Sequence, residues 1–541
     1  GPFTSRYLAG GGMQCCACIR AGRGLYFDTR DPDGYIKDAR FELLDGGTGI
    51  RYSGGHPLPR ETAARTGYDL PYSATVRPFA GGWFEAAAIY REWAGQQRWA
   101  VESARRTASG ARREIDDIAL WVWNRGTAAE AAEPVAALQK DLGLPMAIDW
   151  YWWHNQPYDT AYPRYFPPRE GRAPFMRAVA RLREQGIFTQ VYTNGMLWDM
   201  DDPGWADGGE ASAIMNADGS VKNHVFNAYI PHRLAFMCGT GEPFRAKMTA
   251  VAGEVRSLGL SGLYLDVIGC ACNTECHNPA HAHPAGGGRY QVQGFRGLIT
   301  AIAARCPGFP LSTESCAEMF LDLLDAAIML EPSAERLGWW DFRGHGEVVP
   351  LFRAIYADGF RLFGNYAIID GVPPFDPLWP DSGRRATERD WQALCPDQFF
   401  VEIARNVVWG LQPTVACLRN GHLQNPKYAR EVEFLKQAAR FYHARREFLL
   451  RGRMAPPGEL ETPTLTVTCL RRMIFTREGE ERLIESRLPA VLHSVWEARD
   501  GRRLLVLANI STVRQACRWS GRDRQVSATL EPRQFAAVAL S

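Results

Sequence analysis

Acidic residues end several apolar runs of this 541-residue chain. Asp266 closes one such run, and Glu314 closes the next one along the chain. If the two runs are adjacent strands about 4.8 Å apart, both carboxyl groups face one cleft. Carboxyl pairs of this kind hydrolyse glycosidic bonds, with retention at separations of about 5–5.5 Å and with inversion at about 6.5–9.5 Å. The pair therefore predicts glycosidic-bond chemistry, with Glu318 or Glu331 as an alternative acid.

The two acids are predicted to have different roles. Ionised Asp266 would attack the anomeric carbon, while Glu314, kept protonated by apolar surroundings and by the neighbouring charge, would protonate the leaving oxygen. Each residue also has a purely structural interpretation. An Asp at a strand end often caps the following turn, and a Glu at a helix start is favoured by the helix dipole.

Tryptophans are frequent, with 17 in the chain. Six of them lie in or just after three apolar runs: Trp121, Trp123, Trp150, Trp152, Trp153 and Trp198. Flat aromatic faces suit the apolar faces of sugar rings, although a strand tryptophan is more often a core residue. Carboxylates and amides such as those of Asp149 and Asn194 discriminate between sugar hydroxyls. The predicted substrate-binding residues are Asp149, Trp150, Trp153, His154, Asn194, Trp198, His281, His283 and Glu331.

A cysteine- and histidine-rich segment spans residues 269–288. Within fourteen residues it contains Cys270, Cys272, Cys276, His277, His281 and His283. Thiolates and imidazoles bind zinc tetrahedrally, but this spacing does not match a common two-plus-two motif. A local disulfide is a second alternative, and a substrate-binding loop with His281 or His283 in the sugar pocket is the third. We expect the substrate-binding loop, and therefore no metal ion and no cofactor.

These candidates need a scaffold that brings strand ends together. Between residues 111 and 452, apolar runs alternate with helical segments, which is typical of βα units around a parallel sheet. Strands are predicted at residues 118–123, 146–151, 188–192, 262–266, 309–313, 326–330, 360–367 and 413–418. Helices are predicted at 131–142, 175–185, 245–258, 295–305 and 399–409. Eight such strands predict an α/β fold, a (β/α)8 TIM barrel, whose reactive groups lie at the C-terminal strand ends.

An open, doubly wound sheet is the alternative to the barrel. Such a sheet normally has a Gly-rich phosphate turn after its first strand, and residues 123–126 do not form one. Residues 1–110 are predicted as an N-terminal β-sandwich portion with a linking helix. After a long helix at 428–451, residues 453–541 are predicted as a C-terminal β-sandwich, with Asp500-Gly501 as a hairpin turn.

The composition limits the classes of partner. The chain carries 62 Lys+Arg against 60 Asp+Glu, a net charge of +2 that offers no field for nucleic acid. No run reaches the roughly 18 apolar residues that a membrane span needs, so we expect a soluble protein whose partner is a carbohydrate or glycoside. No secretory signal is visible, and Gly1-Pro2 is typical of a protease scar. The compartment, cytoplasmic or periplasmic/secreted, and the oligomeric state stay open.

Four short motifs carry a resemblance to a known family: residues 263–266, Asp149-Trp150, Thr313-Glu314 and the helix at 90–94. They resemble a bacterial family of glycosidase-like barrels of unknown function, distantly similar to endo-α-N-acetylgalactosaminidases and α-galactosidases. The resemblance spans most of residues 20–420. It implies retaining hydrolysis of an α-linked galactose-, N-acetylgalactosamine- or glucose-like sugar.

The resemblance also implies residue roles. An Asp nucleophile ends the fourth strand and a Glu acid/base ends the fifth, which are the positions of Asp266 and Glu314, and Asp149 would bind a sugar hydroxyl. The α-galactosidases take their acid from the sixth strand, which keeps Glu331 as an alternative. Their double-Asp signature is absent, because Trp150 follows Asp149.

Two other function classes compete with the retaining hydrolase. A non-catalytic carbohydrate-binding protein would keep the tryptophans but needs no close carboxyl pair. A metal-dependent barrel hydrolase would activate water with His277, His281, His283 and Asp266.

Overall fold

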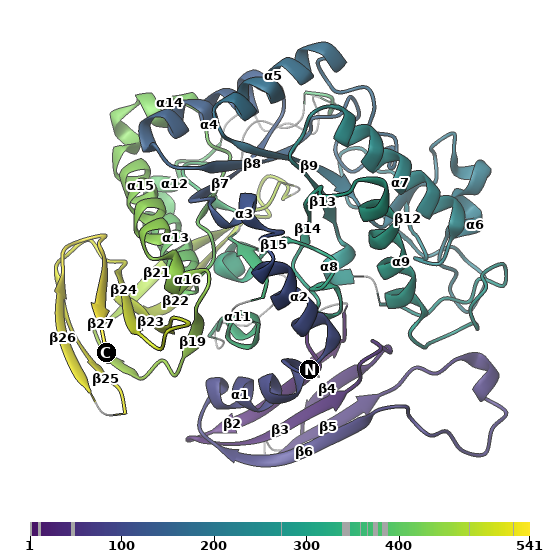
Figure 1. Ribbon diagram of the computed structural model, residues 1–541, viewed down its shortest axis with the longest axis horizontal. Helices are drawn as coiled ribbons and strands as arrows, with labels where there is room; N and C mark the ends of the chain where they lie inside the picture. The colour runs from purple at the N-terminus through teal and green to yellow at the C-terminus, as the bar shows by residue number, and fades with distance from the viewer. Residues whose placement is uncertain are drawn as a thin grey trace. The chain divides into compact units, whose positions relative to one another are not determined.

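The computed structural model describes residues 3–8, 12–44, 49–271, 273–337, 347–356, 359–364, 366–371, 377–380, 388–474, 476–522 and 524–540 (Figure 1). The chain divides into two compact units. Unit 1 consists of Gly1–Arg106, His154–Pro167 and Tyr192–Ala327. Unit 2 consists of Thr107–Trp153, Pro168–Val191 and Ile328–Ser541.

Unit 1 begins with two antiparallel sheets. In order of pairing, their strands are β1 (Phe3–Arg6), β4 (Asp38–Leu43) and β5 (Ile50–Gly55) in one, and β2 (Cys15–Arg20), β3 (Arg23–Arg30) and β6 (Ser73–Ala80) in the other. Phe27 of β3 stacks on Tyr52 of β5 with 4.2 Å between ring centroids, and it meets Phe41 of β4 edge-on at 6.3 Å. Side chains of both sheets therefore share an aromatic core. Helix α1 (Trp83–Ala94) follows β6.

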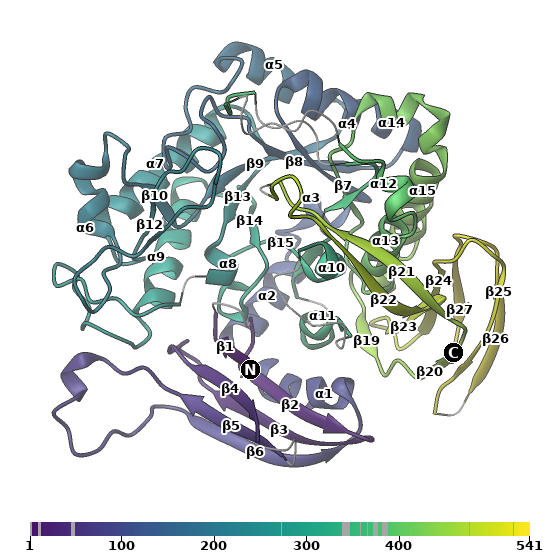
Figure 2. The same ribbon diagram turned by 180° about the vertical axis from the view of Figure 1, so that it is seen from behind.

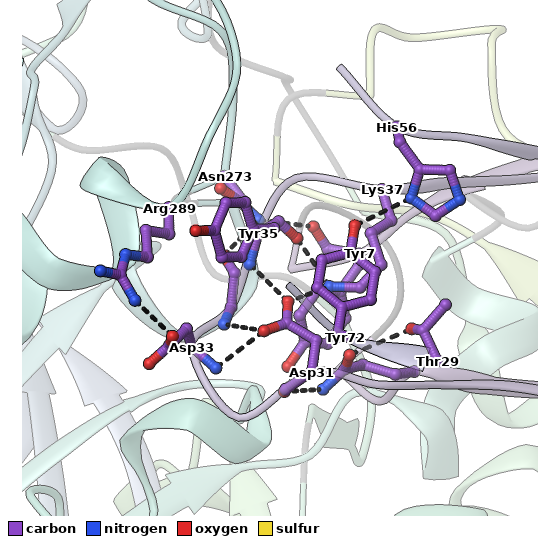
Figure 3. Close-up of polar contacts among 12 residues, drawn as sticks. Tyr7, Thr29, Asp31, Asp33, Tyr35, Lys37, His56, Tyr72, Asn273 and Arg289 are labelled. Carbon is purple, nitrogen blue, oxygen red and sulfur yellow. Dashed lines mark hydrogen bonds and ion pairs between the residues drawn. The ribbon is translucent and has the colours of Figure 1, made fainter. Parts of the chain in front are cut away.

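A buried charge pair holds the turn between β3 and β4. The carboxylate of Asp31, which is 0% exposed, accepts hydrogen bonds from the backbone amides that follow it, Tyr35 among them, and from the Lys37 ammonium (Figure 3). The Lys37 ammonium also lies 4.5 Å from the ring centre of Tyr7 and 4.8 Å from that of Tyr72. Because a buried charge is tolerated only when it is paired and hydrogen-bonded, this arrangement fixes the path of the turn.

The rest of unit 1 holds the strands that end in the candidate acids. Side by side lie β15 (Ala326–Ile328), β14 (Leu311–Glu314), β13 (Gly262–Asp266) and the end of β9 (Phe188–Asn194), and β13 and β14 are parallel. The unit also contains the helices α7 (Glu242–Ser257) and α9 (Tyr290–Arg305). Helix α7 buries Phe244, Met248, Val251 and Val255, a helical spacing that gives it one apolar face. A small antiparallel sheet adds β10 (Leu197–Asp199), β12 (Leu234–Phe236) and β11 (Asn223–His224).

Unit 2 contains the other parallel strands. The start of β9 pairs with β8 (Met146–Tyr151), followed in order by β7 (Leu120–Arg125), β18 (Thr414–Ala416) and β17 (Ala367–Ile368), all parallel. Every residue of β7 and β8 is buried, which is the pattern of strands covered on both faces. The helices of this unit include α4 (Ala128–Leu142), α5 (Arg172–Glu184), α13 (Gln398–Val408) and α15 (Ala429–Ala444).

The end of the chain returns to antiparallel sheets within unit 2. One sheet has the order β19 (Arg453–Ala455), β23 (Val491–Glu497), β24 (Arg503–Asn509) and β27 (Phe535–Ala539), and another has β20 (Glu459–Glu461), β25 (Gln515–Ser520) and β26 (Gln525–Leu530). Val495 and Leu505 of the first sheet share a core with Trp519 of the second. The strands β21 (Thr464–Arg471) and β22 (Arg482–Pro489) form a long hairpin (Figure 2). The predicted turn at Asp500-Gly501 is confirmed, since it joins β23 to β24.

The predicted alternation of parallel strands and helices is confirmed, with two corrections. Each predicted strand segment overlaps an observed strand, but the segment 360–367 contains β16 (Arg361–Phe363) and only the first residue of β17, so the described chain has nine parallel-sheet strands instead of eight. Gly364 follows β16 where a Cβ atom would come within 2.2 Å of the Asn406 side chain, so the close packing there requires glycine. The predicted helix at 428–451 is likewise divided, because Arg445 has a non-helical φ of −117°. Among the described residues, none of the helices has the length and hydropathy needed to cross a membrane.

Candidate active site

The two candidate acids lie at matching ends of two buried strands. In β13 and β14 every residue is buried except the last, and those last residues are Asp266 and Glu314. Leu265 of β13 is in register with Thr313 of β14, so the next residues, Asp266 and Glu314, are level with each other. Paired strands run about 4.8 Å apart, and residues in register direct their side chains to the same face. The fold therefore brings two partly exposed acidic residues to one place.

The backbone turns sharply directly after each acid. Val267, which follows Asp266, has a φ of 71°, and Ser315, which follows Glu314, has a φ of 43°. A residue with a side chain adopts this region at a cost of about 1–3 kcal/mol, and such residues cluster at functional sites. The Thr313 hydroxyl donates to the Leu265 carbonyl at 2.7 Å and accepts from the Gly269 amide at 3.0 Å. These bonds hold the chain after β13 against β14, and they keep the two strand ends together.

Tyrosine hydroxyls hold the carboxylate of Asp266. Tyr264 donates to its Oδ1 at 2.9 Å, and Tyr192, from the end of β9, donates to its Oδ2 at 3.1 Å. The Asn194 side-chain amide donates in turn, through Nδ2, to the Tyr192 hydroxyl at 3.2 Å. Asn194 is itself fixed, because its Oδ1 accepts from the amides of Met196 and Leu197. Both carboxylate oxygens are thus oriented by donors that stabilise the ionised form.

A third carboxyl group, that of Asp159, belongs to the same network. It lies in the loop 154–167 and is 7% exposed, and Tyr162 donates to its Oδ1 at 2.9 Å. The Tyr162 and Tyr192 hydroxyl oxygens are 3.2 Å apart, which connects the loop to Asp266. Sequence analysis did not identify Asp159, Tyr162, Tyr192 or Tyr264. The tyrosines just after the second predicted strand were a signal for the loop, whereas Tyr192 and Tyr264 lie within the third and fourth predicted strands.

The surroundings give Asp266 and Glu314 different pKa values. Burial raises the pKa of Asp266 to about 6, against the opposing effect of the Tyr264 and Tyr192 hydroxyls. Burial, followed by the negative charge of Asp266, raises the pKa of Glu314 to about 8, while a thiol hydrogen bond from Cys270, 3.2 Å from Oε2, opposes that rise. Near neutral pH, Asp266 is therefore ionised and Glu314 protonated. The pKa of Asp159 is raised to about 7, first by burial.

The raised pKa of Glu314 has a consequence for stability. Between its ordinary pKa of 4.5 and its folded value of about 8, the folded chain holds a proton that the unfolded chain releases, so rising pH lowers the free energy of unfolding across this window. Glutamine does not titrate, so Glu314→Gln removes this fall in the free energy of unfolding with rising pH. We expect its melting temperature to match that of the parent near the lower end of the window and to exceed it by about 1–3 °C near the upper end. Differential scanning calorimetry across this pH range measures the gap.

Glu61→Gln, a change of an exposed acid of the same unit, serves as the control for this measurement. Its melting temperature should follow that of the parent at every pH. A constant gap between Glu314→Gln and the parent, independent of pH, would contradict the raised pKa.

The other predicted site residues are placed as follows. In unit 1, His154 is buried with its ring 5.6 Å from that of Tyr165, and Trp198 of β10 is 4% exposed with its ring 6.3 Å from that of Phe244. Asp149, Trp150, Trp153 and Glu331 belong to unit 2.

The two unit 2 tryptophans have the packing of core residues. Trp150 and Trp153 are 0% and 1% exposed, and both lie against Phe175 of α5. The Trp150 indole N–H donates to the Gly126 carbonyl at 2.8 Å, so its polar edge is already satisfied. These two rings therefore pack in the interior of unit 2, against Phe175. Burial raises the pKa of Glu331, which lies at the start of a short 3-10 helix, Glu331–Ser333.

Two histidines of the cysteine- and histidine-rich loop lie beside cysteine thiols. His281 and His283 gather with Cys276 and with Cys238, a residue from a distant part of the chain that sequence analysis did not consider. His277 instead has its Nε2 3.9 Å from Glu275, and Cys270 contacts Glu314, while Cys272 is outside the described residues. The hypothesis that these histidines join Asp266 at one metal ion is therefore wrong for the described residues, because the fold directs them to two thiols. A second group of possible ligands consists of Asp199 and Asp201, at and just after the end of β10, and His232, whose Nδ1 lies 2.6 Å from an Asp199 carboxylate oxygen.

Comparison with known proteins places this site in context. The family model of a domain of unknown function, DUF6259, matches residues 68–367. The chain is 24% identical over 524 residues to a Bacteroides thetaiotaomicron protein named "Putative glycoside hydrolase", an alignment that covers 94% of this chain and 69% of that protein. A similarly named Monosiga brevicollis protein is 26% identical over 427 residues, which are 69% of this chain but only 33% of that relative's length.

Solved structures show the same kind of likeness. The ligand-free α-N-acetylgalactosaminidase of Bifidobacterium bifidum matches with a TM-score of 0.60 and 16% identity, over 93% of this chain and 75% of that one. An α-galactosidase from Geobacillus stearothermophilus matches with a TM-score of 0.53 and 11% identity, over 100% of this chain and 71% of that one. These likenesses establish a shared fold. The predicted resemblance to a glycosidase-like family of unknown function is confirmed.

Proposed function

This chain belongs to the DUF6259 family, and from that premise and the geometry of the acid pair we propose that it is a glycoside hydrolase that cleaves an α-linked sugar with retention. The names of its relatives support hydrolysis of glycosides, and the names of the structural neighbours favour a galactose- or N-acetylgalactosamine-like sugar. The finer predictions remain part of this proposal: a (β/α)8 barrel at residues 111–452, flanked by β-sandwich parts at 1–110 and 453–541.

One observation carries the proposal. Asp266 and Glu314 are the partly exposed last residues of two paired parallel strands, level in register, and the lower pKa belongs to Asp266. A retaining hydrolase needs a carboxylate and a carboxylic acid about 5–5.5 Å apart, a spacing close to the distance between adjacent strands. A protein that only bound carbohydrate would have no use for two carboxyl groups in different protonation states.

The proposed reaction has two steps. In the first, an Asp266 oxygen forms a bond to the anomeric carbon as the bond to the leaving oxygen breaks, and Glu314 gives its proton to that oxygen. In the second, Glu314 takes a proton from water, which attacks the anomeric carbon and releases Asp266 as a carboxylate. Tyr264 and Tyr192 orient Asp266 throughout. Glu331 remains the alternative acid, and Asn194, Trp198 and Asp149 remain candidates for sugar contacts.

The protonation states predict a bell-shaped pH profile. Activity requires Asp266 without its proton and Glu314 with its proton, so kcat/KM should rise as pH passes about 6 and fall as it passes about 8. These two inflections belong to the coupled pair. Initial rates on an α-glycoside across this range measure them. An activity that keeps rising above the second inflection would contradict a protonated acid.

The experiment that tests the proposal is a screen of nitrophenyl α- and β-glycosides followed by NMR of the first-formed sugar. We expect cleavage of an α-glycoside, with galactosides and N-acetylgalactosaminides as the first choices, and the α-anomer as the initial product. Release of the β-anomer first would show inversion and would exclude Asp266 as a nucleophile. Sugar binding without any turnover would favour the carbohydrate-binding alternative.

A further inference from the structure

Four side chains with metal-binding atoms converge in unit 1 at a place separate from the acid pair. One ligand atom each from Cys238, Cys276, His281 and His283 lies within 4.8 Å of all the others. We propose that these residues form a structural zinc site. Two thiolates and two imidazoles are a ligand set that zinc favours, and four protein ligands leave no open position for a substrate or water.

The distances suit a tetrahedral ion. Zinc binds sulfur at about 2.3 Å and imidazole nitrogen at about 2.0–2.1 Å, so in a tetrahedron the sulfur and nitrogen atoms are about 3.6 Å apart. The Cys276 Sγ is 3.4 Å from His281 Nδ1, and the Cys238 Sγ is 3.5 Å from His283 Nε2. Both separations approach the expected edge of the tetrahedron.

The histidines are oriented as metal ligands are. The Nε2 of His281 is 2.9 Å from the Ala211 carbonyl, and the Nδ1 of His283 is 2.8 Å from the Pro284 carbonyl. Because a carbonyl only accepts, each of these nitrogens carries the hydrogen, and the other nitrogen presents its lone pair to the sulfur atoms. A ring N–H donated to a backbone carbonyl is the usual outer contact of a zinc-bound histidine. His283 is further fixed by stacking on Tyr290, with 3.6 Å between ring centroids and 5° between planes.

The backbone forms a closed loop around the ligands. Cys276 and Gly286 exchange backbone hydrogen bonds of 3.1 and 2.8 Å, so the segment between them, which contains both histidines, is a closed turn. Cys238 enters from the chain between β12 and α7. This separation in sequence is why the loop by itself has no two-plus-two zinc spacing. Both cysteines are 0% exposed and carry free thiols, so a disulfide does not account for their approach.

The loop connects the acid pair to the N-terminal sheets. It starts beyond Cys270, which contacts Glu314, and it ends at Gly287, where a Cβ atom would lie 2.0 Å from the Pro57 carbonyl oxygen. A zinc ion would fasten the middle of this loop to the chain between β12 and α7. The role of the ion would be to stabilise the fold around the site, and it would replace the sugar-binding role predicted for His281 and His283.

The test is elemental analysis of the full chain, purified without an affinity tag and without chelators. We expect about one zinc ion per chain. Cys276→Ser and His283→Gln should each weaken zinc binding by more than the 10- to 100-fold that loss of an outer contact typically costs, measured by competition with a chromophoric chelator. The matched controls His277→Gln and Cys306→Ser change residues of the same types in unit 1 outside the cluster and should retain zinc at the parent level.

X-ray absorption at the zinc edge of the parent provides a readout that does not depend on the folding of any variant. Two sulfur and two nitrogen neighbours at the distances given above are expected. Absence of zinc from the parent after purification with added zinc would overturn the proposal. So would a zinc environment of nitrogen and oxygen only, or equal zinc retention by the parent and by the Cys276→Ser/His283→Gln double variant.

Discussion

Replacing Asp266 by Asn should lower the turnover of an α-glycoside by about 10³-fold or more while changing sugar binding only a few-fold. The amide has nearly the same shape, and its oxygen still accepts a hydrogen bond from one of the two tyrosines that hold the carboxylate. What is lost is the negative charge that attacks the anomeric carbon. Steady-state kinetics on a nitrophenyl α-glycoside measures the loss, and calorimetric titration with the free sugar measures binding.

The matched control for this change is Asp218→Asn. Asp218 is an exposed acid of unit 1 whose carboxylate accepts hydrogen bonds from the Ser220 amide and hydroxyl in a turn. The Asp218→Asn variant should have a turnover within about 2-fold of the parent, as expected for most surface substitutions. If Asp266→Asn keeps near-normal turnover while it remains folded, Asp266 is not the nucleophile.

Replacing Glu314 by Gln should produce an effect that depends on the leaving group. Without a proton donor, cleavage of a substrate with a poor leaving group should fall by about 10²–10⁴-fold, whereas a nitrophenolate can leave without one. The second step also loses its base. With a nitrophenyl α-glycoside we therefore expect a rapid burst of about one nitrophenolate per chain followed by slow turnover, because the glycosyl-enzyme accumulates. Stopped-flow absorbance measures the burst.

Two further variants make this prediction specific. Glu61→Gln should show no burst and parent-like rates, since Glu61 is an exposed residue of the unit. Glu331→Gln is the decisive comparison for the alternative acid. If it shows the burst and Glu314→Gln does not, the acid/base role belongs to Glu331. Loss of the alkaline limb of the pH profile should accompany the burst in the same variant.

Local sequence patterns were sufficient to place the strands and the two acids. A carboxyl residue at the end of a buried apolar run marks the point where a strand leaves the core, and Asp266 and Glu314 both lie at such points. The segments of β8 and β13 were predicted with the observed bounds, although β8 carries the buried polar residue Asp149 in its interior. The seventh segment was predicted as one strand, although Gly364-Asn365 lies inside it and Gly-Asn is a turn signal. The structure has β16 before this pair and β17 after it.

The site residues that were not predicted depend on contacts between parts of the chain that are distant in sequence. Asp159 and Tyr192 join Asp266 only because a loop and a strand end meet it in the fold, and no spacing in the sequence records that. The position of Cys238 beside Cys276 is hidden for the same reason. The tryptophans show the reverse error, in which residues predicted to bind sugar have the packing of core residues. When both faces of a strand are buried, composition cannot tell a ring that meets a sugar from one that packs on a helix, as Trp150 does on Phe175.

Azide rescue of Asp266→Gly tests the central claim most directly. The glycine leaves space beside the anomeric carbon where azide takes the place of the missing carboxylate. If Asp266 is the nucleophile of a retaining α-glycosidase, azide should restore cleavage of a nitrophenyl α-glycoside, and NMR of the product should show the β-glycosyl azide. A product with the α configuration, or an Asp266→Gly variant that is as active without azide as with it, would contradict the account.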